Sequence, residues 1–420
     1  MSLELAICLV ALVLWTLTVI QGSCALWQGV RFHRYVSERV DRAPDLADES
    51  GRFKYQPKAA VVLPCCGIDD ELRQTVQALQ CQNYADYEVI FTFESEEDPA
   101  YAAVGEWIDD WASLPHRRVV AGLTEGRSQK VHNLLAAVEE VSPDREVFAF
   151  LDSDAVPGED WLGHMVAPLE DETVGATTGY RWYSARGGFA EGLRCNWNAA
   201  TVTLLSDEKL NFSWGGATAI LRKTFEAFEI SKHWSTSLTD DYPITLAARR
   251  AGKIIRFVPQ ALIPSEDSTT LRDFWVFARR QLIITRVYVP EIWRAGFTLC
   301  LNFVVGGTAA AALFFASLLG WVGGPAVTIA AFAGWMLVLA LASGKALVRQ
   351  LAIRKVLRPP AWTWLDFWWD VGGVSLTGLL HLALLVSSGV SRRFTWRKTL
   401  YELISPTETR VLRRGGTAGD

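Results

Sequence analysis

The sequence has little charge and lacks the spaced cysteine and histidine motifs of metal and disulfide proteins. Of its 420 residues, 21% are charged and 50% are hydrophobic, which excludes disordered, collagen-like and disulfide-scaffold proteins. Its seven cysteines show no CxxC spacing and its six histidines no HxxxH spacing, so we expect reduced thiols in a cytoplasmic catalytic part and no zinc site. Neither GxSxG nor GxxxxGK(S/T) occurs, so the sequence lacks the motif of serine hydrolases and that of P-loop nucleotide-binding proteins. The net charge of −5 does not indicate a nucleic-acid partner.

Charge is absent altogether from one long segment near the N-terminus. Residues 5–30 contain no Asp, Glu, Lys or Arg, and a helix of this length exceeds the ~30 Å hydrocarbon core of a bilayer. We therefore expect residues 1–30 to form an N-terminal transmembrane helix. Glu4 precedes the segment, whereas Arg31 and Arg34 follow it. This order argues against a cleaved signal peptide, and the positive-inside rule predicts that the chain continues into the cytoplasm.

Uncharged segments return near the C-terminus, and we expect residues 295–391 to form a second transmembrane region of two to three spans. Residues 295–344 lack charge and are interrupted by Gly320 and Pro325, so they are long enough for two spans and a tight turn. Basic residues and then an aromatic belt, Trp362 to Trp369, precede a third uncharged segment at 371–391.

The side on which the C-terminal tail emerges is left open. Residues 392–420 begin with a basic motif and end, after Arg414, in a Gly-rich tail that we expect to be flexible. If all three segments cross, the basic motif lies on the opposite side from the central domain, against the positive-inside rule. A re-entrant bend at Gly372 and Gly373 would keep it cytoplasmic. Disorder is also expected for residues 41–54.

Between the apolar segments, residues 31–294 alternate short β-rich runs with helical segments. This alternation predicts a cytoplasmic α/β domain with a Rossmann-like, mostly parallel sheet. The expected strands are 59–63, 87–93, 118–121 and 147–151, and the expected helices are 72–79, 100–111 and 131–141.

Two carboxylates stand at the end of one expected strand. Phe148 to Leu151 form an apolar run that is followed by Asp152 and Asp154, and ligands of α/β sheets bind at the carboxyl ends of strands. Carboxylates this close repel each other unless a cation lies between them, and Mg²⁺ or Mn²⁺ held there would also neutralise a diphosphate. The alternative is a solvated turn, but the preceding strand and the helix start after it favour a metal and nucleotide site.

A second acidic pair, Asp240 and Asp241, opens an Ala- and Arg-rich helical segment. Acids in a first helical turn are favourable with the helix dipole, so helix capping is one interpretation. The other is that one of the pair is a general base, whose pKa is raised towards neutrality by burial and by its acidic neighbour.

With these motifs the chain resembles the membrane-bound family 2 type of glycosyltransferase with a GT-A fold, and most closely the ceramide glucosyltransferase group and its bacterial relatives. The resemblance extends from the first span to about residue 403. It implies inverting transfer of a sugar from a nucleotide donor, UDP-linked, to the hydroxyl of a membrane lipid such as ceramide. It also implies a multi-pass membrane protein, of the inner membrane in bacteria, that uses a divalent cation.

The resemblance also implies roles for individual residues. Asp152 and Asp154 match the metal motif, and Asp241 matches the catalytic base, with Asp240 beside it in the acidic pair. Donor contacts are implied for a set of residues at strand ends and a helix start: Pro64 near the uridine, Glu94 and Asp98 in the first acidic motif, and Lys130 and Asn133 near the diphosphate.

Two short motifs nearer the C-terminus complete the set of expected site residues. Trp214 and Gly215 are expected to bring backbone close to the acceptor, with a plain turn as the alternative. Trp396 and Arg397 resemble the closing Trp-Arg element of the family.

One family motif is missing. Gln/Arg-x-x-Arg-Trp should follow the base, but neither its Arg nor its Trp falls where it should when Arg280 or Gln281 takes the first position. Arg279, Arg280, Arg286 or Arg397 are then the candidates for contacting the diphosphate. The alternative for the first three is a basic helix at the membrane surface with one apolar side.

Two other functions remain open. A processive polysaccharide synthase usually needs more spans to thread its polymer and relies on the missing Arg-Trp motif. An inactive, membrane-anchored sugar-nucleotide-binding protein is supported only by that same absence. Nucleotide release measured with and without a lipid acceptor would separate the three.

Overall fold

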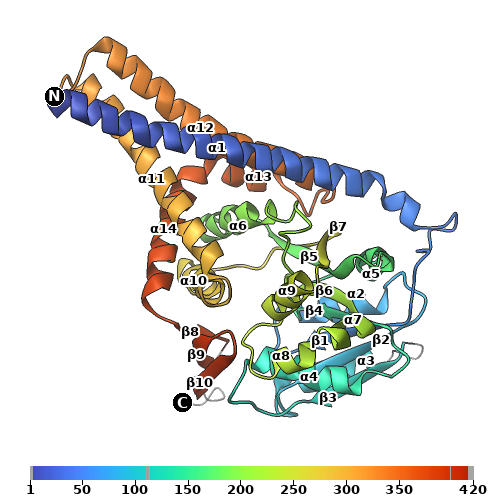
Figure 1. Cartoon of the computed structure of the whole chain (residues 1–420). Helices are drawn as coiled ribbons and strands as arrows, with labels where there is room; N and C mark the ends of the chain where they lie inside the picture. The colour runs from blue at the N-terminus through green and yellow to red at the C-terminus, as the bar shows by residue number, and fades with distance from the viewer. Residues whose placement is uncertain (1–2, 110, 112–113, 398, 415–420) are drawn as a thin grey trace. The chain divides into compact units, whose positions relative to one another are not determined.

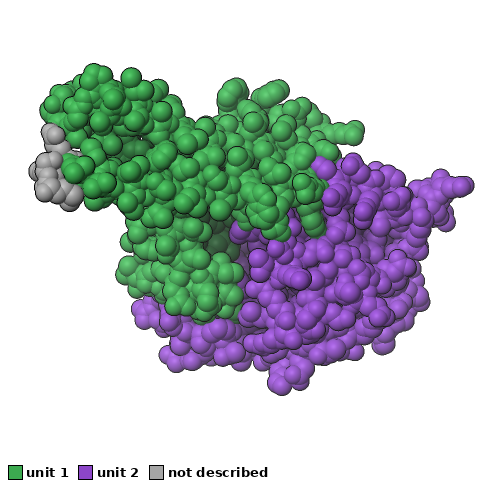
Figure 2. Space-filling model, turned by 45° about the horizontal axis from the view of Figure 1, so that its top comes forward, with its two compact units in different colours: residues 1–35, 184–203, 268–391 green, residues 36–183, 204–267, 392–420 purple. Residues whose placement is uncertain are grey.

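The computed structural model describes residues 3–109, 111, 114–397 and 399–414. The chain forms two compact units, each built from three stretches of sequence (Figure 2). We call residues 1–35, 184–203 and 268–391 the helical unit, and residues 36–183, 204–267 and 392–420 the sheet unit.

The sheet unit contains a seven-stranded sheet that is mostly parallel (Figure 1). Its strands are β1 (Ala59–Pro64), β2 (Tyr87–Phe93), β3 (His116–Val120), β4 (Val147–Leu151), β5 (Val174–Tyr183), β6 (Ala217–Leu221) and β7 (Ile254–Ser265). In the order β3-β2-β1-β4-β6-β5-β7, only β6 runs antiparallel to its neighbours. The predicted α/β class with a mostly parallel sheet is confirmed, and all four expected strands are present.

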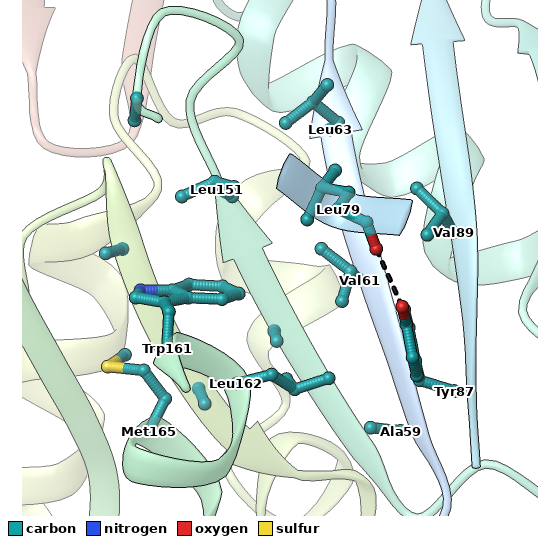
Figure 3. Packing of buried hydrophobic residues seen from close by; sticks show 14 of the residues in the cluster. Ala59, Val61, Leu63, Leu79, Tyr87, Val89, Leu151, Trp161, Leu162 and Met165 are labelled. Carbon is teal, nitrogen blue, oxygen red and sulfur yellow. Dashed lines mark hydrogen bonds between the residues drawn. The ribbon is translucent and has the colours of Figure 1, made fainter. Parts of the chain in front are cut away.

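Alternating side chains along the strands bury a helical layer on each face of the sheet. Val61 and Leu63 of β1 pack with α2 (Leu72–Gln80), α3 (Pro99–Ile108) and α5 (Trp161–Val166). Val62, one residue along, packs on the other face with α4 (Gln129–Glu140), α7 (Arg222–Ala227), α8 (Ile230–Trp234) and α9 (Asp241–Arg250). Figure 3 shows the first face, where the Tyr87 hydroxyl donates to the Leu79 carbonyl at 2.7 Å.

The helical unit contains most of α1 (Leu3–Asp41), together with α6 (Phe189–Val202), α10 (Leu271–Tyr288), α11 (Pro290–Leu318), α12 (Pro325–Ile353), α13 (Trp364–Gly372) and α14 (Val374–Val390). Of these, α1, α11 and α12 are long and apolar enough to cross a membrane, which agrees with the expected N-terminal span and the two spans after it. Helices α13 and α14 are bent by 67° at their junction, where the sequence suggested a bend at Gly372 and Gly373.

A buried ion pair holds α12 against α13 inside the helical unit. Arg349 is 3% exposed and Asp370 is fully buried, and Arg349 Nε donates to Asp370 Oδ2 at 2.9 Å. Gln350 donates to the same carboxylate at 2.8 Å and accepts from Trp362 Nε1 at 2.7 Å. A buried pair is tolerated when its remaining polar atoms are bonded in this way, which explains a buried arginine within a mostly apolar helix.

Two stretches of the expected central domain, 184–203 and 268–294, belong to the helical unit. Leu193 and Trp197 of α6 pack with Phe274 of α10 and Leu384 of α14. This apolar cluster is the reason why the two stretches do not group with the rest of residues 31–294, because it joins α6 and α10 to a C-terminal helix far along the chain. Sequence order alone does not indicate such a grouping.

The C-terminal residues form a small antiparallel sheet that the sequence did not indicate. Its strands are β8 (Arg393–Trp396), β9 (Thr399–Ser405) and β10 (Glu408–Arg414), in the order β10-β9-β8. This sheet belongs to the sheet unit, where Val411 N donates to the Glu125 carbonyl at 3.3 Å. The tail after Arg414, for which flexibility is expected, lies outside the described residues.

The expectation of disorder at residues 41–54 is wrong. Ala43–Leu46 form a 3-10 helix, and Ala47 pairs with Phe53 in a β-bridge. Phe53 is only 6% exposed, and its ring lies edge-on to His164 with 5.0 Å between ring centroids. One buried aromatic ring therefore anchors a segment whose composition is otherwise polar.

We predict that Gly163→Ala releases this segment. A Cβ on Gly163 would lie 2.1 Å from the Phe53 ring, so the ring must move, and overpacking of this kind costs about 1–3 kcal/mol. Trypsin should then cleave after Arg52 or Lys54 faster than in the wild-type protein, as followed by mass spectrometry. Gly158→Ala is the matched control, because a Cβ there meets nothing within 4 Å. Equal cleavage of the two variants would contradict the packing.

Candidate functional site

Three elements of the sheet unit converge at the carboxyl end of β4. Asp152 and Asp154 follow β4, Lys130 is the second residue of α4, and Asp240 directly precedes α9. Lys130 Nζ lies 2.7 Å from Asp152 Oδ1 and 3.1 Å from Asp240 Oδ1, and it donates to the Gly215 carbonyl at 2.9 Å. One ammonium group thus joins the two acidic pairs that the sequence singles out.

Local backbone structure explains why these side chains meet. The Ser128 side chain caps α4 by accepting a hydrogen bond from the third residue of that helix, which fixes the helix start beside Lys130. Asp152 N donates to the Gly216 carbonyl at 3.1 Å, which brings the turn before β6 to the end of β4. A Cβ on Gly215 would lie 2.5 Å from the Asp240 carboxylate, so a larger residue does not fit there.

The two acids at the start of α9 have different surroundings. Asp240 is 4% exposed, and its side chain makes no capping hydrogen bond but lies against Lys130. Asp241 is half-buried, and its Oδ1 accepts hydrogen bonds from the Thr239 hydroxyl and from Tyr242 N, the latter at 2.7 Å. Capping therefore does not explain Asp240, and the Asp241 carboxylate is held in one orientation.

Burial raises the pKa of both acids. For Asp240 this effect outweighs the nearby Lys130 ammonium and raises the pKa to about 7. For Asp241 burial also raises the pKa, although the Thr239 hydroxyl acts in the opposite direction. A carboxylate with a raised pKa is a stronger base than an ordinary aspartate, as proton removal from a hydroxyl requires.

Arg181 of β5 is a further charged group at this site, and the sequence analysis missed it. Its Nη2 lies 2.5 Å from Asp154 Oδ1 and 3.8 Å from Asp152 Oδ2. Burial acts to raise the pKa of Asp154, but the Arg181 guanidinium outweighs it and lowers this pKa to about 2. The available signal was a single charge within the otherwise uncharged run 174–183, since a charge in an apolar strand needs a charged partner.

The first acidic motif shapes the loop after β1. Asp98 is 8% exposed, and its Oδ1 accepts hydrogen bonds from the start of α3 and from Gly67 N, both at 2.9 Å. Gly67 has a φ of +67°, which glycine adopts without strain. Pro64 ends β1 and Glu94 directly follows the parallel strand β2, so both lie at the same edge of the sheet as Asp152.

Two other expected site residues have well-defined surroundings. Asn133 is 2% exposed, and its Oδ1 accepts from Gln129 Nε2 at 2.9 Å. Trp214 N donates to Thr178 Oγ1 at 2.8 Å, and its ring centroid lies 5.7 Å from the guanidinium carbon of Arg181. Contacts of Asn133 with a diphosphate and of Trp214 with an acceptor remain predictions.

The closing motif reaches the loop after β1 from the C-terminal sheet. The Arg397 guanidinium donates two hydrogen bonds to Asp69, at 2.6 and 2.5 Å, and this pairing raises the pKa of Arg397. The Tyr401 hydroxyl accepts from Gln129 N at 3.3 Å, and its ring lies 6.5 Å from that of Trp396. The motif therefore lies against the loop after β1 and the start of α4.

Arg279, Arg280 and Gln281 lie in α10 of the helical unit. Arg279 Nε donates to Ser387 Oγ at 3.0 Å, and Arg286 donates to the Gly389 carbonyl. These bonds join α10 to the end of α14, and contacts of Arg279 and Arg286 with a diphosphate or with the membrane surface stay predictions. Donor contacts of Arg280 and Gln281 stay predictions.

The two carboxylates after β4 suit a hard divalent cation. The Asp152 and Asp154 side chains are 28% and 33% exposed, and Mg²⁺ is usually held by one or two carboxylates together with substrate phosphates and water. Among the described residues, no group of three His, Cys, Asp or Glu side chains could hold a metal ion. Two carboxylates leave coordination positions open, so this pair fits a cation that a donor diphosphate helps to coordinate.

Comparison with known protein families assigns the chain to one of them. A family model described as glycosyl transferase family 21 matches residues 10–409, which include both acidic pairs, most of α1, and all of α11 and α12. The chain belongs to glycosyl transferase family 21. The resemblance inferred from the sequence motifs is confirmed.

Three individual proteins that this family 21 chain is similar to share only low identity or a short segment with it. Ceramide glucosyltransferase 1 of Caenorhabditis elegans is 30% identical over 81 residues, which span 19% of this chain and only 17% of that protein. A mannosyltransferase of Pyrobaculum calidifontis, solved in complex with GDP-Man and Mn²⁺, is 14% identical with a TM-score of 0.43, covering 88% of this chain and 99% of its own. The 4-diphosphocytidyl-2C-methyl-D-erythritol synthase of Anaerococcus prevotii is 12% identical with a TM-score of 0.35, covering 52% and 93%.

We predict that Lys130→Met destabilises the family 21 protein. Asp240 would be left as a buried carboxylate without its paired cation, and removing one partner of a buried pair costs about 3–5 kcal/mol. Thermal unfolding in detergent, followed by tryptophan fluorescence, should show a lower midpoint. Lys130→Met combined with Asp240→Asn removes both charges and should recover part of the loss. A double variant that is less stable than Lys130→Met would contradict the pairing.

Proposed function

We propose that this protein transfers a sugar, with inversion, from a UDP-linked donor to the hydroxyl of a membrane lipid such as ceramide, on a GT-A type of domain. The observation that carries this proposal is the meeting of Asp152 and Asp240 at Lys130, at the sheet edge where Asp154 also lies. It occurs in a chain with helices apolar enough to cross a membrane. The segment shared with a ceramide glucosyltransferase supports a lipid acceptor.

In this proposal Asp241 takes the proton of the acceptor hydroxyl as the oxygen attacks the anomeric carbon of the sugar. Burial raises the pKa of Asp241 in the direction that base catalysis needs. Thr239 and Tyr242 hold the carboxylate in place, which lowers the entropic cost of aligning base and acceptor. A single displacement inverts the anomeric configuration, whereas retention would need a nucleophilic carboxylate as well.

In this proposal, basic side chains and a divalent cation together offset the negative charge of the leaving nucleotide. Asp152 and Asp154 would hold Mg²⁺ or Mn²⁺, which supplies Lewis-acid stabilisation of the leaving diphosphate. Lys130 pairs with Asp152 in the free protein, and in this proposal it exchanges that contact for a diphosphate oxygen when the donor and the cation bind. Arg397 supplies the positive charge of the missing Arg-Trp motif, because it belongs to the same unit and acts electrostatically on Asp154.

The C-terminal sheet supports a topology for the membrane helices. Arg397 contacts Asp69 and Tyr401 contacts Gln129, so both sheets of this unit lie on one side of the membrane. An even number of crossings must then separate them. Helices α11 and α12 provide two, and we propose that the bent pair α13 and α14 enters and leaves on the same side. The positive-inside rule makes that side cytoplasmic, which in a bacterium is the cytoplasmic face of the inner membrane.

A transfer assay with the full chain in nanodiscs tests this function. UDP release from UDP-glucose should require ceramide, and the lipid product should gain one hexose by mass spectrometry. Asp241→Asn should slow release by ~100-fold to 10,000-fold because the base is lost, while UDP affinity is kept. Asp144→Asn, an exposed acid of the same unit that pairs with Lys58, is the matched control and should retain full activity.

Other outcomes of this assay would replace the proposal. Lipid products carrying many sugars would indicate a processive synthase, and UDP binding without release on any lipid would indicate an inactive binder. Full activity of Asp241→Asn would show that another residue is the base.

The topology predicts which cysteines an impermeant maleimide can reach in intact cells. Cys81 is exposed in the sheet unit, so it should react only after the cells are permeabilised. Trp321→Cys, placed in the turn between α11 and α12 in a Cys81→Ser background, should react from outside because Trp321 is 72% exposed. Labelling of Cys81 in intact cells would contradict this orientation and place the sheet unit outside the cytoplasm.

A further inference from the structure

Arg181 lies between the two carboxylates that would hold a metal ion. It comes from β5, the sixth strand across the sheet, and is 6% exposed. Its Nη2 lies 2.5 Å from Asp154 and 3.8 Å from Asp152. The guanidinium carbon lies 5.7 Å from the centroid of the Trp214 ring and 5.8 Å from that of Tyr183. Two aromatic rings and two carboxylates thus surround one fixed positive charge.

Without a ligand, the charges of this acidic pair are already balanced by the protein. Lys130 pairs with Asp152 and Arg181 pairs with Asp154, so each carboxylate has its own cation. A divalent ion bound to the same oxygens would lie close to both positive groups, and like charges in a partly buried site repel strongly. Mn²⁺ alone is therefore expected to bind weakly.

A donor diphosphate changes this balance. Its negative oxygens offset the charge of the metal ion and offer new partners to the cation displaced from Asp154. A guanidinium suits this exchange, because its planar fork binds carboxylate and phosphate oxygens with the same bidentate geometry. Arg181 is at Asp154, within reach of any group coordinated there.

We propose that Arg181 couples metal binding to donor binding: it neutralises Asp154 in the free protein and passes to the donor diphosphate when a divalent cation takes that carboxylate. The inference rests on the proposed function. By linkage, the factor by which UDP tightens Mn²⁺ binding equals the factor by which Mn²⁺ tightens UDP binding. Arg181 thereby disfavours metal without donor and favours the complete complex.

The test is a binding cycle on the full chain in nanodiscs. Mn²⁺ affinity is measured by electron paramagnetic resonance with and without UDP, and UDP affinity by calorimetry with and without Mn²⁺. We expect each ligand to tighten the other by about 10-fold or more in the wild-type protein. In Arg181→Met, Mn²⁺ alone should bind more tightly than in the wild type, while UDP in the presence of Mn²⁺ should bind less tightly. A residue with a merely structural role would not improve metal affinity when removed.

Two further variants keep the test decisive. Arg145→Met removes another buried arginine of the same unit, paired with Asp86, and should leave the coupling at the wild-type value. Arg181→Lys keeps the positive charge but loses the bidentate geometry of the guanidinium. Mn²⁺ alone should therefore bind as in the wild type, while the factor by which UDP and Mn²⁺ tighten each other's binding should fall. This variant decides the question if Arg181→Met does not fold.

Wild-type coupling in Arg181→Met, or in Arg181→Lys where Arg181→Met is unfolded, would overturn the inference and leave the proposed function standing. A wild-type protein that binds Mn²⁺ but neither UDP nor GDP would overturn both.

Discussion

The site depends on the Lys130 ammonium, whose hydrogen bonds join three separate parts of the sheet unit. It contacts Asp152 after β4, Asp240 before α9 and the Gly215 carbonyl before β6. These are the three donors that a lysine has, so the charge is fully satisfied. Burial favours a neutral amine, but Asp152 and Asp240 outweigh it and raise the pKa of Lys130. The group therefore stays charged, and this charge keeps the two acidic pairs together.

The arrangement explains how four acids can lie near one another in a folded protein. Lys130 and Arg181 each stand against a carboxylate after β4, while Asp240 shares Lys130 and has a raised pKa. Buried charges are tolerated when they are paired and hydrogen-bonded. In the proposed mechanism, binding of a metal ion and a diphosphate exchanges one set of balanced charges for another. The cost of desolvating the site is then already met by the fold, and little reorganisation is left for the reaction.

The sequence predicted the features that depend on local patterns. Alternating and continuous apolar runs locate the strands, and the strand ends locate Asp152 and Asp154. Features that depend on distant contacts were missed. Arg397 meets Asp69 across 328 positions of sequence, and Arg181 meets Asp154 only because β5 follows β6 in the sheet. Residues 41–54 were misjudged for the same reason, since Phe53 is buried against a helix that begins at Trp161.

The absence of the Arg-Trp motif is understandable if the reaction requires a positive charge beside the diphosphate, whichever part of the chain supplies it. Arg397 has a φ of +53°, an uncommon conformation for a residue other than glycine. The Arg397 side chain makes two hydrogen bonds to Asp69, and Tyr401, four residues on, contacts the start of α4. A side chain held this firmly is pre-organised in the way that charge stabilisation needs. In the proposed mechanism, the C-terminal sheet therefore supplies from one end of the chain the charge that the family motif supplies from within it.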